Sequence, residues 1–373
     1  MRILNIIPYK VFPAHLGGEK AVVLFNEYMG KKTEVFAVTV RSNDPGYAKY
    51  FKVFNILSDS RIRYANPFLY FKIKKLIHRY QITHLATEHP YFGWLAWLLK
   101  LTTGVQYLVR SHNIEYQRSA SIGRKWWKLL KVYESWVYRK ADWVFFISED
   151  DRKLALEDKK LDPNKTFVLP YGITNRLNKE EIPEAQEVIR KKHHIPSDKK
   201  ILLFNGALYH HTNYDALRII LEQINPILLQ EHSDRYVIIV CGKGLPASFN
   251  ELKQYSGRNV IYAGFVEDIS LYFKAADIFL NPIMAGGGVK TKAIEAIGYN
   301  CTVISSPLGA MGIERGVCGE KLIVAENNNW KDFAEKVIFE LDKQSDTPES
   351  FYDYYNWESV TENVIKILSQ QDA

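Results

Sequence analysis

Residues 278–298 read IFLNPIMAGGGVKTKAIEAIG, and this stretch places a strand, a glycine-rich loop and a helix in direct succession. The apolar run Ile278–Asn281 predicts a buried strand, which Pro282 ends because proline lacks the N–H that a sheet requires. Gly286–Gly288 predict a flexible loop, and Thr291–Gly298 has the apolar spacing of a helix. This succession is the repeating unit of parallel α/β sheets.

The same unit recurs on both sides of this stretch. In the first half we expect strands at 2–7, 34–40, 84–86, 106–110, 143–147 and 166–169, with helices at 19–28, 67–80 and 125–140. In the second half we expect strands at 200–204, 236–241, 260–263, 278–281, 302–305 and 321–324, with helices at 214–230, 269–275, 291–298 and 329–343.

Two such runs in 373 residues predict an α/β protein with two doubly wound, Rossmann-like domains facing a central cleft. We expect an N-terminal domain at residues 1–175 and a C-terminal domain at 195–345, separated by the polar stretch 174–199. Ligands of doubly wound sheets bind beyond the carboxyl ends of the strands, so the sites should lie there.

Composition limits the classes of protein that this chain can belong to. Hydrophobic residues make up 47% and charged residues 24%, as in globular proteins. The sequence contains no run of 18 apolar residues, so we expect no membrane-spanning segment. Residues 1–8 resemble a buried strand rather than a signal peptide. The three cysteines are far apart, which fits buried thiols in a reducing cytoplasm rather than a disulfide framework.

Charge is unevenly divided along the chain. Residues 1–175 contain 28 Lys and Arg against 15 Asp and Glu, whereas the remainder contains 21 against 27. A basic half predicts an anionic partner: nucleic acid, a membrane surface or a phosphate-bearing substrate. No nucleic-acid-binding module is recognisable, so we expect no nucleic-acid partner.

The glycine-rich loop is the strongest candidate for an anion site. A phosphate at the start of the helix 291–298 would meet glycine N–H groups, the positive end of the helix, Lys290 and Lys292. Glu295 lies on roughly the same helix face as Lys292 and could accept hydrogen bonds from vicinal sugar hydroxyls. The residues alone fit a surface helix with a Lys–Glu pair equally well.

Three further places follow predicted strands. Gly17 and Gly18 precede the first helix and could let an anion approach it, or they could form a plain turn. Gly206 follows the strand 200–204, where a side chain would fill the cleft. His112 follows the strand 106–110 and is either a structural histidine or a group that contacts a sugar or phosphate oxygen.

A metal site is not expected. His210 and His211 are adjacent in sequence, and such neighbours rarely point at one ion. No Asp-x-Asp triplet is present to hold a divalent ion on a diphosphate. We therefore predict neither a metal nor a cofactor.

In this order, these landmarks resemble the retaining glycosyltransferases of GT-B fold often called family 4. The best stretches run from Asn259 to Asp268, from Ala275 to Pro282, and through the glycines to Ala296. Gly17-Gly18, Ser111-His112-Asn113 and residues 170–173 add to the resemblance.

The resemblance implies roles for particular residues. Glu295 looks like the second acid of the family's pair, which holds the ribose, while Gly287 stands where the first acid contacts the donor sugar. Phe265 and Val266 would flank the nucleobase through backbone groups. Lys290 and Lys292 would take over the diphosphate, and residues 357–370 would form a last helix that returns to the first domain.

By this resemblance, the chain is expected to move a sugar from a nucleoside diphosphate sugar to a saccharide or lipid-linked acceptor, with retention and without metal. His112, Lys292 and Glu295 would be the catalytic residues, and bacterial-type surface polysaccharide or glycolipid would be the product. A sugar-nucleotide epimerase of the same fold and a non-catalytic binding module are the alternatives.

Basic stretches in the first half mix cations with interfacial aromatic residues, as at 124–133 and 71–75. They predict a cytoplasmic protein that contacts the inner, anionic face of a membrane. The alternative is an amphipathic helix whose Trp and Leu lie in the core.

Overall fold

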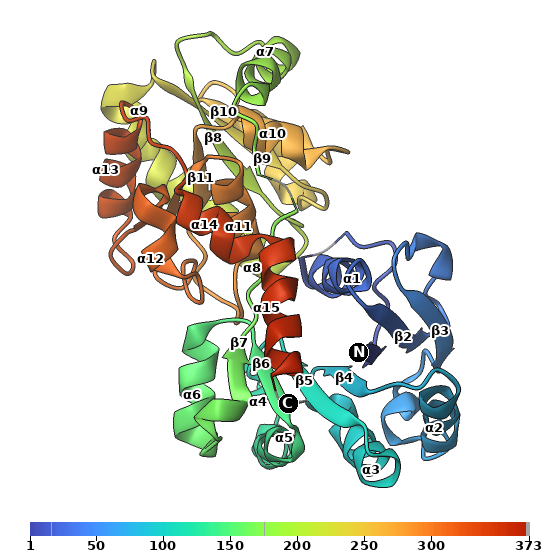
Figure 1. Cartoon of the computed structure of the whole chain (residues 1–373). Helices are drawn as coiled ribbons and strands as arrows, with labels where there is room; N and C mark the ends of the chain where they lie inside the picture. The colour runs from blue at the N-terminus through green and yellow to red at the C-terminus, as the bar shows by residue number, and fades with distance from the viewer. Residues whose placement is uncertain (16, 122, 175, 371–373) are drawn as a thin grey trace. The chain divides into compact units, whose positions relative to one another are not determined.

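The structure is a computed structural model that describes residues 1–15, 17–121, 123–174 and 176–370, apart from the side chain of Glu231. The chain forms two compact units (Figure 1). Unit 1 comprises Met1–Gly172 and Tyr355–Ala373, and unit 2 comprises Ile173–Tyr354.

Unit 1 is built on a parallel sheet of seven strands, and the strand order reverses between β1 and β4. Its strands, in spatial order, are β3 (Lys52–Leu57), β2 (Glu34–Val40), β1 (Arg2–Ile6), β4 (His84–Glu88), β5 (Gln106–Ser111), β6 (Trp143–Phe146) and β7 (Thr166–Val168). Such a reversal opens a crevice at the carboxyl ends of the two strands beside it.

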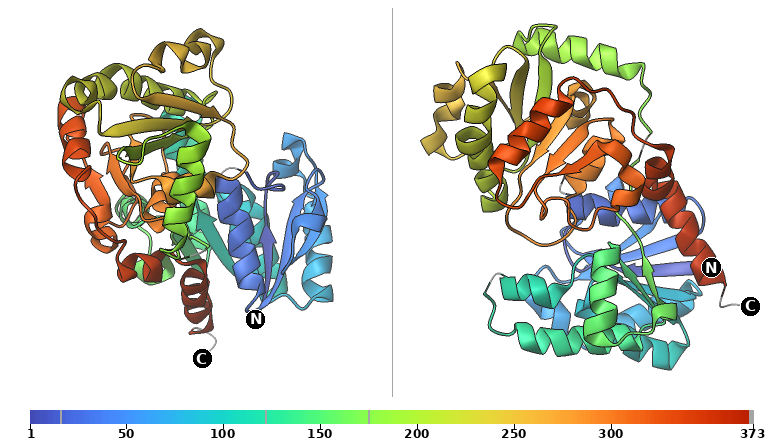
Figure 2. Two further views of the ribbon diagram at one scale, coloured as in Figure 1. Left: turned by 90° about the horizontal axis from the view of Figure 1, so that it is seen from above. Right: turned by 90° about the vertical axis from the view of Figure 1, so that its left-hand side faces the viewer.

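Helices cover both faces of this sheet (Figure 2). They are α1 (Gly17–Gly30), α2 (Leu69–Arg79), α3 (Gly93–Thr103), α4 (Glu115–Ser121), α5 (Trp127–Lys140), α6 (Glu149–Lys159) and α15 (Trp357–Ser369). Short 3₁₀ turns lie at Pro45–Tyr47, Arg61–Ala65, Pro90–Phe92 and Pro163–Lys165.

The last helix, α15, packs against α1 within unit 1. Its first residue, Trp357, is 1% exposed and stacks on Tyr28 with ring centroids 6.5 Å apart. The indole also covers Gly172 so closely that a Cβ there would lie 2.3 Å from it. The helix therefore completes the core of a unit whose sheet and other helices all come from residues before 173.

Unit 2 repeats the architecture with six parallel strands, and the order reverses between β8 and β11. Its strands, in spatial order, are β10 (Val260–Gly264), β9 (Tyr236–Cys241), β8 (Lys200–Asn205), β11 (Ile278–Asn281), β12 (Thr302–Ser305) and β13 (Leu322–Val324). The α-helices are α7 (Glu181–His193), α8 (His211–Ile219), α9 (Asn225–His232), α10 (Ile269–Ala275), α11 (Thr291–Gly298), α12 (Arg315–Cys318), α13 (Trp330–Glu340) and α14 (Glu349–Tyr355). A π-helical segment lies at Ile220–Ile224, and 3₁₀ turns lie at Ala247–Tyr255 and Gly319–Lys321.

The predicted fold class is confirmed, since both sheets are parallel and doubly wound. Several elements differ from the prediction, and two of these differences have a clear physical reason. The helix expected at 214–230 is α8, the π-helical segment and α9, because Pro226 in the first turn of α9 cannot donate to the preceding turn. The strand β3 was not predicted, because most of its side chains are only half-buried and give no apolar run.

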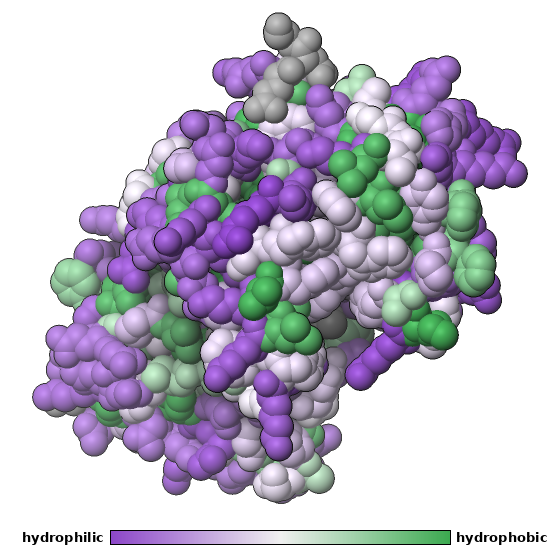
Figure 3. Space-filling view, turned by 90° about the horizontal axis from the view of Figure 1, so that it is seen from below, coloured by the Kyte–Doolittle hydropathy of each residue, from purple (hydrophilic) through white to green (hydrophobic). Residues whose placement is uncertain are grey.

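Several large apolar side chains of unit 1 face solvent. Trp126, Leu129 and Val132, just before and within the first turns of α5, are 47%, 73% and 68% exposed. Phe68 and Phe71, at the start of α2, are 70% and 67% exposed. Figure 3 shows the molecule from below Figure 1, with hydrophobic residues as islands among hydrophilic ones. Among the described residues, no helix is long and apolar enough to cross a bilayer.

Candidate active site

A cluster of buried polar side chains lies at the point where the strand order of unit 1 reverses. Asn5, Glu88 and Arg110 come from the carboxyl ends of β1, β4 and β5, and each is less than 5% exposed. Glu88 pairs directly with Arg110 across two strands, and Asn5 pairs with Ala86. The parallel register therefore brings three residues that are far apart in sequence to one edge of the sheet.

The carboxylate of Glu88 is bonded on both oxygens. Oε1 accepts hydrogen bonds from Asn5 Nδ2 at 2.7 Å and from Arg110 Nη1 at 2.6 Å, and Oε2 is bonded to Nε2 of His112. Burial by itself would raise the pKa of Glu88, but Arg110 and His112 outweigh it and hold that pKa at about 2. The carboxylate is therefore ionised at neutral pH.

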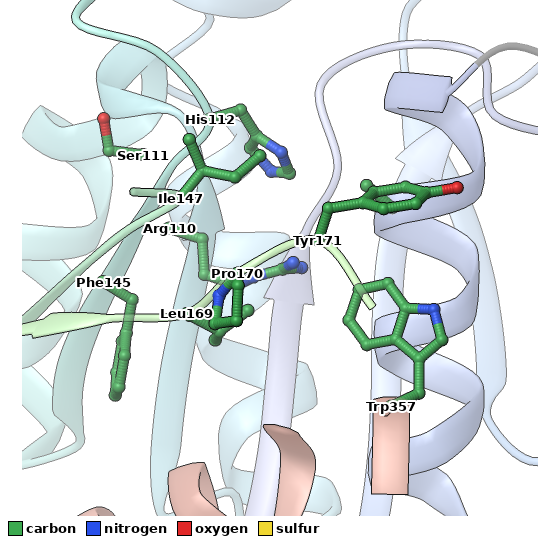
Figure 4. A pocket seen from close by; sticks show the side chains of 10 residues that line it. Arg110, Ser111, His112, Phe145, Ile147, Leu169, Pro170, Tyr171 and Trp357 are labelled. Atoms are coloured by element: carbon green, nitrogen blue, oxygen red, sulfur yellow. The ribbon is translucent and has the colours of Figure 1, made fainter. Parts of the chain in front are cut away.

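His112 follows β5 and lines a pocket together with Arg110, Tyr171 and Trp357 (Figure 4). Burial lowers its pKa to about 4, although the charge and hydrogen bond of Glu88 act in the opposite direction. The imidazole is therefore neutral at pH 7. The guanidinium carbon of Arg110 lies 3.6 Å from the centre of the Phe25 ring, which fixes the cation beneath α1.

A second histidine and carboxylate lie beside the first pair. The rings of His89 and His112 are 4.7 Å apart, and His89 Nδ1 lies 3.1 Å from Oε1 of Glu115. Tyr91 donates its hydroxyl to the other oxygen of Glu115 at 2.6 Å. Burial opposes ionisation of Glu115, but His89 and Tyr91 outweigh it and lower its pKa to about 2.

Side chains of α5 form hydrogen bonds with the loop that carries His112. Ser111 Oγ lies 2.7 Å from the hydroxyl of Tyr138, and the backbone N–H of Glu115 donates to Glu134 at 2.9 Å. Glu134 also binds the ammonium of Lys159 at 3.0 Å, and both side chains are fully buried. These bonds hold both ends of the loop, so the backbone at His112 has little freedom.

Gly17 and Gly18 form the first residues of α1, at the first βα junction of unit 1. A Cβ at Gly18 would meet no atom within 4 Å, so this position is open. There is thus room beside Gly18 for another group, and the role of these glycines in anion binding stays a prediction.

In unit 2, Lys292 and Gly206 come together at the point where the strand order reverses. Lys292, in the first turn of α11, donates its ammonium to the carbonyl of Asn205 at 3.0 Å, and Gly206 is the next residue. Burial lowers the pKa of Lys292 to about 8, and Glu295 opposes this shift. A bound anion would favour the charged form of this lysine.

The glycine loop is organised around Lys290. Its ammonium donates to the carbonyls of Gly286, Gly287 and Gly288 at 3.1, 3.2 and 2.8 Å. In a trans peptide the C=O and the following N–H point in opposite directions, so the N–H groups after these carbonyls point away from Lys290. No side chain caps the start of α11, where the N–H groups of Thr291 and Ala293 donate to the carbonyls of Val289 and Lys290 at 3.1 and 2.9 Å. The positive end of the helix dipole lies in the same region.

Glu295 and Gly287 complete the predicted donor residues of this loop and helix. Glu295 is half-buried on α11 and close enough to Lys292 to act on its pKa. A Cβ at Gly287 would meet nothing within 4 Å, and this glycine is not among those with positive φ. Crowding therefore does not explain why glycine stands there.

Phe265 and Val266 follow β10 at a turn made by Gly264, whose φ is 66°. Phe265 is 67% exposed, and the ammonium of Lys243 lies 5.9 Å from its ring. Val266 is half-buried. An exposed aromatic ring next to a strand end can stack on a planar ligand.

Among the described residues, no three His, Cys, Asp or Glu side chains gather as metal ligands. His211 is 80% exposed and lies 3.6 Å from Asp215 on its own helix. The expected independence of metal stays a prediction.

The residues around His112 were not predicted from the sequence. Glu88, His89 and Glu115 were not singled out, and the strand at 84–86 was ended two residues early. The signal was available: a glutamate and an arginine each end an apolar strand run, at 88 and 110. Charged residues at the ends of buried strands usually mark a site or an ion pair.

Two family models match successive parts of the chain. "Glycosyltransferase Family 4" matches residues 17–175, and "Glycosyl transferases group 1" matches residues 199–342. An uncharacterised 44.6 kDa protein of the cps region of Klebsiella pneumoniae is 27% identical over 62% of this chain and 58% of its own length. The lipopolysaccharide glucosyltransferase WaaG of Escherichia coli K12 is 27% identical over 48% of this chain and 45% of its own length.

The chain thus spans about half the length of the curated relatives that it matches. Its fold is shared over the whole chain with HepE of Anabaena, solved in complex with UDP, at a TM-score of 0.72 and 14% identity. That match covers 99% of this chain and 100% of HepE. With both halves matched by glycosyltransferase models and the doubly wound sheets in place, the chain belongs to the family 4-like glycosyltransferases of GT-B fold.

Proposed function

We propose that this chain transfers a sugar from a nucleoside diphosphate sugar to an acceptor hydroxyl, with retention and without a metal ion. The observation that carries this proposal is the group formed by Lys292, Glu295 and the glycine loop at the carboxyl end of β11. The Lys292 cation, the glycine-loop backbone and the start of α11 lie there, and the Glu295 carboxylate follows Lys292 by one helical turn.

This group matches the chemistry of a nucleoside diphosphate sugar. Lys292 and the N–H groups at the start of α11 bind the diphosphate, and their fixed positive charge stabilises the leaving group as the glycosidic bond breaks. Glu295 accepts hydrogen bonds from vicinal hydroxyls of the ribose. Phe265 and Val266 lie beside the base. UDP in the HepE crystal structure is a ligand of the same class.

The acceptor is a saccharide or a lipid-linked sugar in bacterial-type surface polysaccharide or glycolipid assembly. WaaG, named a lipopolysaccharide glucosyltransferase, supports this class of acceptor. Retention requires attack from the face that the diphosphate leaves, with the leaving phosphate taking the proton of the acceptor hydroxyl. We assign to His112 a contact with the sugar substrate.

The test is calorimetry of nucleoside diphosphate sugars in metal-free buffer, with Glu295→Ala and the exposed-helix control Glu335→Ala. We expect one nucleotide sugar to bind the wild type and the control, and binding to Glu295→Ala to be lost. Equal binding to both variants would contradict the site.

Turnover then separates this proposal from its alternatives. An epimerase would convert the sugar nucleotide without an acceptor, whereas a binding module would bind the nucleotide sugar and convert nothing. Chromatography of the nucleotide products with and without added acceptor lipid distinguishes these outcomes. A requirement for a divalent cation, tested by adding a chelator, would contradict metal independence.

We further propose that the exposed stripe Trp126, Leu129 and Val132 contacts the anionic cytoplasmic face of a membrane. The three residues are spaced three apart, so they share one side of the helix, and the exposed cations Lys125 and Lys128 flank them. Apolar side chains with neighbouring lysines suit the boundary between acyl chains and anionic headgroups.

Sedimentation with phosphatidylglycerol vesicles tests this contact, with phosphatidylcholine vesicles as the control. We expect binding only to the anionic vesicles, and weaker binding for Lys125→Glu with Lys128→Glu. Val188→Glu on α7 of unit 2, which is 44% exposed, serves as the matched surface control. Equal binding to phosphatidylglycerol and phosphatidylcholine vesicles would contradict the proposal.

A further inference from the structure

The two nitrogens of His112 have different surroundings. Nε2 is bonded to Oε2 of Glu88, while Nδ1 has no hydrogen-bond partner among the residues that the structure describes. The side chain keeps 10% of its surface exposed and lines the pocket of unit 1, beside Ile147 in Figure 4. One nitrogen is thus claimed by the protein, and the other is left for a ligand.

We propose that Glu88 is a positioning residue that holds His112 as the neutral Nε2–H tautomer, so that Nδ1 accepts a hydrogen bond from a hydroxyl of the sugar substrate. The part about the sugar rests on the proposed function. The part about the tautomer does not.

The direction of the shared hydrogen bond follows from the partners of Glu88. An ionised carboxylate only accepts, so the proton between Glu88 and His112 belongs to Nε2. Oε1 is already taken by Asn5 and Arg110, and the positive charge of Arg110 keeps the carboxylate ionised. Low pKa values of both Glu88 and His112 agree with a carboxylate facing a neutral imidazole.

The other charged groups near His112 do not supply a second proton. His89 Nδ1 lies 3.1 Å from Oε1 of Glu115, and the other oxygen of that carboxylate accepts from Tyr91. Arg110 lies against Phe25 and is committed to Glu88. His112 therefore has a single arrangement of its proton, set by Glu88.

This tautomer determines what His112 can recognise. An unprotonated Nδ1 can bind an O–H or N–H donor, but it repels a group that only accepts, such as a phosphate oxygen. His112 is thus predicted to select a sugar hydroxyl rather than to hold the diphosphate. A sugar nucleotide with fluorine in place of that hydroxyl should lose the contact.

The tautomer can be measured in the wild-type protein. The chain has ten histidines, and ¹⁵N labelling of histidine gives ring nitrogen shifts that separate the two neutral tautomers from the cation. The signals of His112 are assigned by their loss in His112→Gln. We expect the Nε2–H form at pH 7, and an Nδ1–H or cationic ring would overturn the proposal.

Glu88→Gln provides a sharper test, because an amide has one accepting and one donating end. Asn5 and Arg110 both donate, so they keep the amide oxygen, and the NH₂ group faces Nε2 of His112. We expect the proton to move to Nδ1, which inverts the tautomer. Glu115→Gln is the matched control, and it should leave the His112 signals in the Nε2–H form.

An unchanged tautomer in folded Glu88→Gln would contradict the role of Glu88. If that variant does not fold, the ¹⁵N spectrum of the wild type still tests whether His112 is the Nε2–H tautomer. In folded Glu88→Gln, we expect sugar transfer to fall at least about tenfold, the value of one lost hydrogen bond, while nucleoside diphosphate affinity stays unchanged. A wild type with the Nε2–H tautomer that binds no nucleotide sugar would refute the proposed function alone.

Discussion

His112 is a neutral imidazole inside the folded protein, and this state links stability to pH. Its pKa is 6.5 in the unfolded chain and about 4 in the fold, so the unfolded chain binds more protons between these values. The free energy of unfolding should therefore fall as the pH drops from 6.5 to 4, by up to about 3 kcal/mol, and the loss should stop below pH 4.

Urea unfolding of the wild type and His112→Gln across this pH range measures the effect, since the variant has no imidazole to protonate. Asp151 changes stability in the opposite direction, because burial raises its pKa to about 6, but it is present in both proteins and cancels. Parallel pH curves for the two proteins would show that His112 is charged in the fold.

The protein should tolerate a side chain at Gly287 of unit 2 much better than at Gly242. Gly287 has open space around its Cβ position, whereas a Cβ at Gly242 would lie 1.8 Å from the carbonyl oxygen of Gly206. We expect Gly287→Glu to change the free energy of unfolding by less than about 1 kcal/mol, and Gly242→Ala to cost several times more.

Thermal or urea unfolding of the two variants checks this expectation. Gly287→Glu also restores a carboxylate at the place of the first family acid, so its preference among nucleotide sugars should differ from that of the wild type. A large loss of stability in Gly287→Glu would mean that the loop needs glycine for its backbone.

The individual site residues that could be predicted from the sequence are those that belong to a local pattern. The glycine loop, Lys292 and Glu295 are contiguous, so their proximity follows from chain connectivity. Glu88 and Arg110 are 22 residues apart and meet only through the register of β4 and β5. A single sequence does not display that register, which is why the partner of His112 was missed while His112 was not.

Among the helices, α5 has two faces with different tasks. Its outer side carries exposed Leu129 and Val132, and its inner side carries Glu134 and Tyr138, which hold the His112 loop. The apolar spacing predicted this helix at nearly its observed length. The sequence left two readings for its apolar residues, an exposed membrane-contacting side or a core-facing side, and the exposure of Leu129 and Val132 agrees with the first.

The buried pair of Glu134 and Lys159 should be sensitive to removal of one partner. Glu134→Gln removes the directly bonded counter-charge of the fully buried Lys159 ammonium, and this should cost about 3–5 kcal/mol of unfolding free energy. Glu222→Gln is the control, because its partner Arg218 is 49% exposed, and its loss should stay below about 1 kcal/mol. Chemical denaturation gives both values, and equal losses would contradict the difference in burial.

Elements were predictable where apolar runs were continuous, because buried parallel strands are apolar on both faces. The strands β2, β9, β11 and β12 have the predicted bounds. The half-buried edge strand β3 and the π-helical segment before α9 depend on packing rather than on local pattern. Whether residues 1–175 and 195–345 fold as separate domains stays a prediction, as do the roles of the site residues.

On the scale of the whole molecule, each unit has its own hydrophobic core. Unit 1 needs α15 for its completion, since Trp357, Val360, Val364 and Leu368 are all at most 3% exposed. Ending the chain at Tyr354 should therefore lower the stability of unit 1 by more than about 5 kcal/mol and leave unit 2 unchanged.

Tryptophan fluorescence can follow this loss, because seven of the eight tryptophans belong to unit 1 and only Trp330 belongs to unit 2. A chain ending at Gln370 keeps α15 and serves as the control. If fluorescence unfolds at the same denaturant concentration in both chains, then α15 is not part of the cooperative core of unit 1.

The order of synthesis gives this arrangement a further consequence. A ribosome makes most of unit 1 first, but α15 emerges only after all of unit 2. During translation, unit 2 can reach its final structure while unit 1 still exposes Tyr28 and the backbone at Gly172, the places that Trp357 covers. Unit 1 is thus begun before unit 2 and completed after it, so its core stays uncovered at these places until α15 has been synthesised.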